Sequence, residues 1–105
     1  MTFTLNAPMF DLLVLSIIAK RDAYGYEISQ IIKKAANTKD STLYPVLKKL
    51  QDSRFVETYD QQYQGRNRKY YTITDSGRIH QQNLLKEWDA YKITIDEIVK
   101  GEDIQ

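Results

Sequence analysis

Three basic side chains follow a single glycine in the stretch "QGRNRK", residues 64–69. Arginine and lysine donate to phosphate oxygens, so a dense basic segment of this kind is typical of a surface that binds a polyanion such as nucleic acid. Arg66, Asn67, Arg68 and Lys69 are therefore candidate DNA-binding residues. A solvated hairpin that is basic by chance is the alternative interpretation.

A second candidate surface lies in "STLYPVLKKL", residues 41–50. At helical spacing, one side carries apolar residues and the other carries most hydroxyl, aromatic and basic side chains. The apolar residues are Leu43, Val46, Leu47 and Leu50. Such a face fits the DNA major groove, where side chains reach base edges, thymine methyls and phosphates. An ordinary solvated helix face is the alternative. The candidate residues are Ser41, Thr42, Tyr44, Pro45, Lys48 and Lys49.

Charge is distributed unevenly along the chain. The formal net charge is only +1 over 105 residues, but residues 33–70 carry nine basic and four acidic side chains. The segments before and after them are mildly acidic, with net charges of −1 and −3. A basic centre between acidic flanks favours a polyanionic partner.

Residues suited to catalysis or metal binding are sparse. His80 is the single histidine, and no nucleophile and base accompany it. Asp96 and Glu97 point to different sides of a helix, so they do not form an acid–base pair. The chain has no cysteine, which excludes disulfides and thiolate metal sites, and no ligand cluster has metal-binding spacing. We expect no enzyme activity, no cofactor and no metal site.

The basic segments must be positioned by the surrounding helices. Asn6 is a fair N-cap for a first helix that is almost entirely apolar. A second helix is expected over residues 25–37, and a third begins with Ser41 or Thr42 as its N-cap. The turn of about four residues between them makes a helix-turn-helix candidate. That motif alone is weak evidence, because many helical hairpins share it.

Two strands are expected next, at residues 55–60 and 69–74, joined by an eight-residue loop centred on Gly65. Strand alternation places Tyr71 and Ile73 on one face, where we expect them to pack on the helices. The neighbouring tyrosines of the second strand are interpreted as sheet-packing residues rather than ligand contacts.

The segment from Thr74 onward predicts one long helix. Its apolar residues recur at steps of four and three, the heptad spacing of a helix that needs a partner surface. We expect a homodimer with two-fold symmetry, in which the first and last helices of both chains form the interface, with packing inside one chain as the alternative. The chain would then divide into a domain of helix-turn-helix and hairpin at 1–73 and a dimerisation helix at 74–105. The predicted seam comprises Leu84, Trp88, Tyr91, Ile95 and Ile98.

The single tryptophan, Trp88, lies in the middle of this seam. In a dimer, Trp88 and Tyr91 of the two chains would flank a gap suited to a planar aromatic or cationic small molecule. The alternative is that Trp88 is simply a core residue.

The N-terminal residues lack a basic region ahead of an apolar run, so no signal peptide is expected. The apolar run of residues 9–19 is shorter than the roughly 20 residues that a membrane-spanning helix needs. With no cysteine present, we expect a cytoplasmic protein without a membrane partner.

Several short motifs, taken together, resemble the PadR family of bacterial transcriptional regulators. They are "YGYEI" at residues 24–28, "TLYP" at 42–45, "RKYY" at 68–71 and "TDSGR" at 74–78. The resemblance covers about residues 7–80, and the single terminal helix is similar to that of the short subfamily. It implies an α+β, mainly helical fold: a winged helix-turn-helix with a two-stranded β-wing and a long C-terminal dimerisation helix.

The same resemblance implies a homodimeric, ligand-responsive repressor of a transporter or stress-response operon. Its third helix and wing would bind double-stranded operator DNA at an inverted repeat, with half-sites about one helical turn, roughly 34 Å, apart. A winged helix that binds only proteins is the alternative function.

The sequence departs from the family at Arg54, where a glycine is usual. An arginine in the left-handed conformation of a helix ending costs about 1 kcal/mol. We therefore expect either a different turn or a compensating contact, such as one to phosphate.

Overall fold

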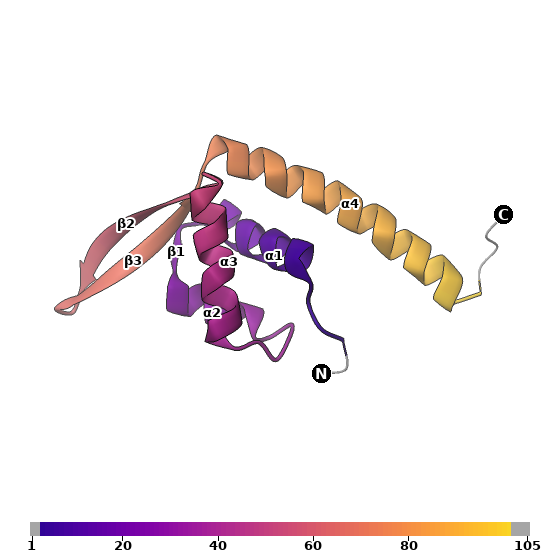
Figure 1. Ribbon diagram of the computed structural model, residues 1–105, viewed down its shortest axis with the longest axis horizontal. Coiled ribbons are helices and arrows are strands. Elements are labelled where there is room, and N and C mark those ends of the chain that lie inside the picture. The colour runs from indigo at the N-terminus through magenta and orange to yellow at the C-terminus, as the bar shows by residue number, and fades with distance from the viewer. Residues whose placement is uncertain (1–2, 102–105) are drawn as a thin grey trace.

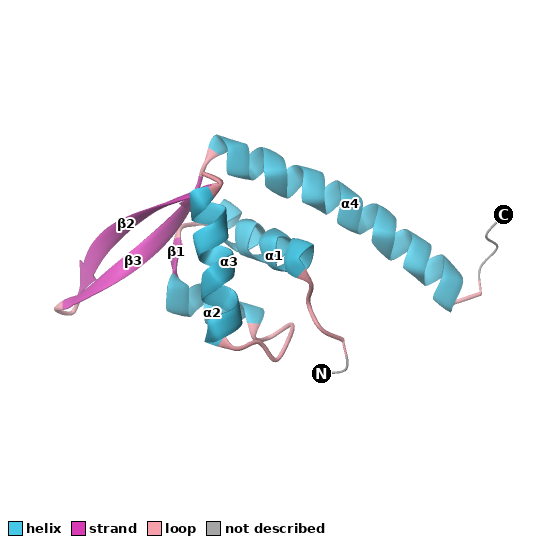
Figure 2. Cartoon of the chain, viewed as in Figure 1, coloured by secondary structure: helices cyan, strands magenta, loops and turns pink. Residues whose placement is uncertain are grey.

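The computed structural model describes residues 3–101, and this part of the chain contains four helices and a three-stranded antiparallel sheet, whose β2–β3 hairpin projects to one side of the helices (Figures 1 and 2). The architecture confirms the α+β, mainly helical fold and the winged helix-turn-helix with a long terminal helix. Residues 1–2 and 102–105, at the ends of the two predicted domains, lie outside the described residues, and the division into two domains stays a prediction. In chain order the elements are α1 (Ala7–Lys20), β1 (Ala23–Tyr24), α2 (Gly25–Ile32), α3 (Asp40–Asp52), β2 (Val56–Tyr63), β3 (Arg66–Ile73) and α4 (Asp75–Val99).

Helix α1 begins where the sequence predicts. Asn6 is its N-cap, and its side-chain oxygen accepts a hydrogen bond from the Met9 amide at 3.1 Å. Val14, Leu15 and Ile18 are buried because α2, α3, α4 and the sheet all contact this helix. The hydrophobic core around α1 therefore fixes the positions of the other elements.

Helix α2 is shorter than predicted. It ends at Ile32 rather than at residue 37, and the chain continues in hydrogen-bonded turns. Those turns bring Ala36 into the core, where it is buried, while Ala35 stays exposed. Burial of an apolar side chain, rather than continued helical spacing, decides the course of this segment.

Helix α3 begins earlier than predicted. Its N-cap residue is Lys39 and its first residue is Asp40, so Ser41 and Thr42 lie in the first turn and are not caps. The Asp40 carboxylate accepts a hydrogen bond from Ser29 Oγ at 2.7 Å, which joins α3 to α2 and lowers the Asp40 pKa. The acidic side chain also suits the positive end of the helix dipole.

The sheet has the strand order β1-β3-β2, so β1 adds a short third strand to the predicted two-stranded wing. Strands β2 and β3 pair along their whole length and leave only Gln64 and Gly65 as the turn. Both turn residues have positive φ, 50° and 77°, as a two-residue type I′ hairpin requires. The predicted eight-residue loop is therefore wrong, because residues 61–63 and 66–68 belong to the strands.

A dense set of hydrogen bonds joins the end of α3 to the start of α4. Arg54 has φ 63°, the left-handed conformation that the usual glycine would adopt. Its carbonyl oxygen accepts hydrogen bonds from Thr74 Oγ1 at 2.8 Å and Ser76 Oγ at 3.1 Å. The Phe55 amide closes the helix by donating to the Leu50 carbonyl at 3.0 Å. The turn is thus kept, and these bonds to the Arg54 carbonyl would form equally with a glycine at this position.

Gly77 allows α4 to approach this joint closely. A Cβ at Gly77 would lie 2.1 Å from the Phe55 carbonyl oxygen, far inside van der Waals contact. Thr74, not Asp75, is the N-cap of α4, and its hydroxyl accepts from the Gly77 amide at 3.0 Å. The segment "TDSGR" therefore locks the terminal helix onto the end of α3.

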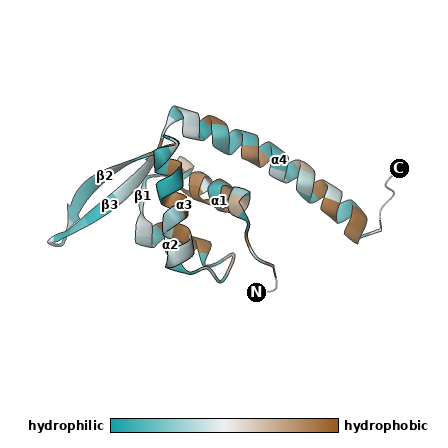
Figure 3. Ribbon diagram, in the orientation of Figure 1, coloured by the Kyte–Doolittle hydropathy of each residue, from teal (hydrophilic) through white to brown (hydrophobic). Residues whose placement is uncertain are grey.

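Helix α4 packs on α1 only through its first half. Gln81 Nε2 donates to Ser16 Oγ at 3.1 Å, and Leu84 packs against the core. Farther along, Tyr91, Ile95 and Ile98 are 62%, 38% and 60% exposed. Figure 1 shows this half reaching beyond the rest of the molecule, and Figure 3 shows that apolar residues continue to its end. Among residues 3–101, no helix has the length and apolar character that crossing a membrane requires.

Candidate nucleic-acid interface

The outer face of α3 is exposed, as predicted, while Leu43, Leu47 and Leu50 bury the opposite face. The ring of Tyr44 lies close to Gly25 at the start of α2, where an added Cβ would be 3.1 Å from the ring. The small residue on α2 therefore gives Tyr44 its place on the surface. The exposed side chains of this face are Ser41, Thr42, Tyr44, Pro45, Lys48 and Lys49.

The two lysines of this face have different surroundings. Lys48 Nζ lies 3.3 Å from an exposed Asp52 carboxylate one turn later, and such a surface pair is weak enough for the lysine to leave. Lys49 Nζ lies 3.1 Å from Asp11 on α1, whose side chain is only 11% exposed. The other oxygen, Asp11 Oδ1, is buried without a partner among the described residues. Lys49 therefore ties α3 to α1, because removing it would leave a buried carboxylate unpaired.

The pairing of β2 with β3 divides the predicted basic residues of the wing between two faces. Alternation places Asn67 and Lys69 on the face of Tyr71, which is buried against the helices as predicted. Arg66 and Arg68 lie on the opposite face. The sequence alone treats the four as one basic tip, but the structure shows two separate pairs.

The outer face of the sheet carries a row of aromatic rings that sequence reasoning missed. Tyr70 stacks on Tyr59 with a centroid separation of 5.5 Å and meets Tyr24 edge-on at the same separation. The Arg68 guanidinium lies 4.3 Å from the Tyr24 ring centroid and 3.9 Å from that of Tyr63. The spacing of the tyrosines in the sequence was the one signal for this row. It indicates neighbouring rings only when the pairing of β1 and β2 with β3 is known.

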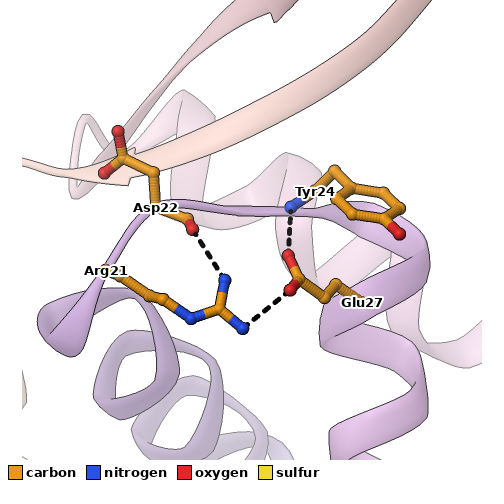
Figure 4. Close-up of polar contacts among 4 residues, drawn as sticks. All are labelled: Arg21, Asp22, Tyr24 and Glu27. Carbon is orange, nitrogen blue, oxygen red and sulfur yellow. Dashed lines mark hydrogen bonds and ion pairs between the residues drawn. The ribbon is translucent and has the colours of Figure 1, made fainter. Parts of the chain in front are cut away.

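Polar contacts hold the segment that leads into this row (Figure 4). Arg21 pairs with Glu27 at 2.7 Å, and Glu27 also accepts from the Tyr24 amide at 3.4 Å. The Arg21 guanidinium thereby lowers the pKa of the Glu27 carboxyl. Nearby, Tyr59 Oη donates to Asp22 at 2.7 Å, which raises the Tyr59 pKa. These contacts fix β1 beside β3, so that the motifs "YGYEI" and "RKYY" lie next to each other.

The predicted effector residues lie together on α4. Trp88 is half-buried and Tyr91 is exposed, with their ring centroids 6.2 Å apart. Lys92 Nζ lies 6.0 Å from the Trp88 ring, at the outer limit of a cation–π contact. One chain alone therefore offers an aromatic pair with a cation beside it.

Similarity to known proteins identifies the family of the chain. Residues 14–83 match the family described as "Transcriptional regulator PadR-like family". The chain belongs to this family. The PadR resemblance of the short motifs is thereby confirmed, and so is the expectation that the chain is a regulator and not an enzyme.

Relatives of known structure support the same assignment. The chain resembles a solved structure from Streptococcus mutans UA159, with 50% identity, a TM-score of 0.93, and coverage of 100% of this chain and 99% of the other. It is 35% identical to the negative transcriptional regulator PadR of Bacillus subtilis (strain 168), over 85% of this chain and 50% of that protein. The crystal structure of Bacillus subtilis PadR in complex with operator DNA matches with 30% identity and a TM-score of 0.65, over 71% of this chain and 45% of the other.

Proposed function

We propose that this PadR-family regulator is a homodimeric repressor that binds an inverted-repeat operator through α3 and the β2–β3 hairpin. The observation that carries the proposal is the likeness to Bacillus subtilis PadR, whose structure contains operator DNA. The outer face of α3 supports it, because this face is exposed and offers hydroxyl, aromatic and basic groups in place of apolar ones.

The proposed contacts divide by chemistry. Thr42, Tyr44 and Pro45, near the start of α3, reach base edges and thymine methyls in the major groove. Arg66 is exposed at the hairpin turn and enters the adjacent minor groove, where arginine favours narrow A·T tracts. Phosphate contacts, which set affinity and salt dependence, come from the remaining polar and basic residues. These are Ser41, Lys48, Lys49, Asn67 and Lys69.

The second half of α4 is the proposed dimer contact. Tyr91, Ile95 and Ile98 are exposed and lie at heptad spacing, and a second copy of the chain would bury them. A two-fold axis through this helix pair presents two α3 helices to the DNA. Half-sites about one helical turn apart, roughly 34 Å, follow from that symmetry.

An effector is proposed to bind between Trp88 and Tyr91 of the two copies, and thereby to change the spacing of the two α3 helices. The ammonium group of Lys92 near the Trp88 ring disfavours a second cation, so a planar aromatic compound fits better than a cationic one. Titration of planar dyes should quench Trp88 fluorescence. Unchanged emission across a broad panel would contradict the site. Transporter or stress-response genes beside the operator would fit such a sensor.

The test of DNA binding begins with selection from random duplexes, which should return an inverted repeat. Fluorescence anisotropy with that site then measures affinity against salt. Arg66→Ala removes two contacts per dimer, so the slope of log K against log salt should fall by about 2. Lys86→Ala, an exposed lysine on α4, is the matched control and should leave both values unchanged.

The same experiment addresses the alternative of a protein-binding winged helix. If selection returns no enriched sequence and no duplex binds even at low salt, specific DNA binding is wrong and the interaction module becomes the better account. Binding that is tight but equal for all duplexes would also contradict an operator-specific repressor.

A further inference from the structure

Arg68 is held in a way that its neighbour Arg66 is not. The guanidinium of Arg68 lies close to two rings, 4.3 Å from the Tyr24 centroid and 3.9 Å from the Tyr63 centroid. Arg68 is only partly exposed, whereas Arg66 is exposed. A guanidinium group stacks on aromatic faces through its plane, so Arg68 already has two aromatic partners within the chain.

The three stacked residues belong to three different strands. Tyr24 ends β1 and is the N-cap residue of α2, while Tyr63 ends β2 beside the hairpin turn. Arg68 on β3 therefore joins the far part of the hairpin to the start of the helix that supports α3. In the ladder itself, Arg68 stands opposite Gln61, so the stack reaches sideways to both neighbouring strands.

Beyond this stack, the outer half of the hairpin is held mainly by the Tyr59–Asp22 hydrogen bond and by the contact between the Tyr59 and Tyr70 rings. Val56 of β2 is buried and Thr58 is half-buried, but residues 59–63 are all exposed. A two-stranded hairpin is marginally stable in water when no core supports it. The position of the tip relative to α3 therefore depends on the contacts of its own side chains, and the Tyr24–Arg68–Tyr63 stack is the one that ties it to α2.

We propose that Arg68 is a positioning residue that holds the hairpin at a fixed angle to α3. In this role it sets where Arg66 and Lys69 meet the DNA, instead of making a phosphate contact as its main contribution. The inference rests on the proposed DNA binding for its functional consequence. The structural part, that the stack orders the hairpin, stands by itself and can be measured without DNA.

The first experiment measures amide hydrogen exchange in the free protein, residue by residue along β2 and β3. Arg68→Lys keeps the positive charge but cannot stack as a plane, so exchange near the turn should rise about fivefold to tenfold. Arg66→Lys is the matched control, on the same face without a stacked ring, and should leave exchange unchanged. Equal exchange in wild type and Arg68→Lys would overturn the proposal. An unchanged thermal midpoint would show that the core stays folded.

The second experiment measures DNA affinity with the selected operator. Arg68→Lys should weaken binding about tenfold, as should Tyr63→Leu, which removes a ring but no charge. The double variant should bind no more weakly than either single variant, because both break one stack. Lys86→Ala, an exposed lysine on α4 outside the proposed DNA contacts, is the control and should bind as well as wild type. If Arg68→Lys binds normally, Arg68 is a simple phosphate contact that lysine can replace. If both single variants weaken binding and their losses add in the double variant, the two residues do not act through one stack. Either result overturns the positioning role.

The two experiments separate the two proposals. If wild type binds no DNA but exchange responds to Arg68→Lys, the proposed function fails and the positioning role survives. If operator binding is normal in every stack variant and exchange does not change, the positioning role fails and the proposed function survives.

Discussion

The two halves of α4 have the same apolar spacing and opposite surroundings. The first half packs against α1 through Leu84, and Gly77 and Gln81 are buried there. The second half continues the seam with Tyr91 and Ile95, but these side chains remain exposed. Heptad spacing thus shows which side of the helix needs a partner, and does not show whether the partner belongs to the same chain.

The contrast also shows how a terminal helix can transmit a change. The packed half is locked to the end of α3 by the bonds of Thr74 and Ser76 to Arg54. The exposed half reaches beyond the rest of the described chain in Figure 1. A movement imposed on the exposed half by a second copy or by an effector would therefore pass through a rigid joint to α3.

The largest effect is expected at the packed half, from Gly77→Ala. The new Cβ would lie 2.1 Å from the Phe55 carbonyl, so the joint must open and the free energy of unfolding should fall by about 3 kcal/mol. Helix propensity alone predicts the opposite, a gain of about 1 kcal/mol. Urea denaturation measures the change, with Asn83→Ala on the exposed surface of the same helix as control. A stabilised Gly77→Ala protein would show that the joint is loose.

A smaller effect, an increase in the free energy of unfolding, is expected at Arg54, whose carbonyl accepts the bonds that hold the start of α4. Arg54→Gly relieves the left-handed conformation at φ 63° and should raise the free energy of unfolding by about 1 kcal/mol. Arg54→Ala removes the same side chain but keeps the backbone cost, so it should give no such gain. If both variants weaken operator binding equally, the side chain also contacts phosphate. If Arg54→Gly lowers the free energy of unfolding, the Arg54 side chain makes stabilising contacts that outweigh the backbone strain.

The smallest effect is expected on the side of α4 away from the seam. Ile93 is 56% exposed and lies about 160° around the helix from Ile95. Ile93→Ser should change the free energy of unfolding by less than about 0.5 kcal/mol and leave the mass in solution unchanged. Sedimentation with Ile95→Ser in parallel tests this. If Ile93→Ser has the molecular mass of a single chain, the dimer contact lies on the Ile93 side of α4 and the predicted contact on the Ile95 side is wrong.

Local signals in the sequence were sufficient for the fold. Asn6 and Thr74 cap helices because their side chains bond within three residues, and the apolar spacing of α3 names its buried leucines correctly. The boundaries failed where distant contacts decide. Helix α2 stops early so that Ala36 can enter the core, and Asp40 begins α3 in contact with Ser29.

The side-chain partners of the candidate site were beyond sequence reasoning. The pairing of Lys49 with Asp11 joins residues 38 positions apart, and nothing local marks it. The hairpin register depended on Gln64 and Gly65 forming a tight turn, for which Asn-Gly is the usual signal. Without that register, Arg68 could not be separated from the other basic residues of the wing.

The most direct test of this account is the molecular mass of the chain in solution, measured by sedimentation equilibrium at micromolar concentration. We predict twice the 12.3 kDa chain mass for wild type, and the mass of one chain for the Ile95→Lys/Ile98→Lys variant, with helix content retained in both. If the variant keeps the mass of a dimer, the dimer contact does not involve Ile95 and Ile98. A wild type that stays at 12.3 kDa up to tens of micromolar would contradict the proposal that a second copy covers the exposed half of α4.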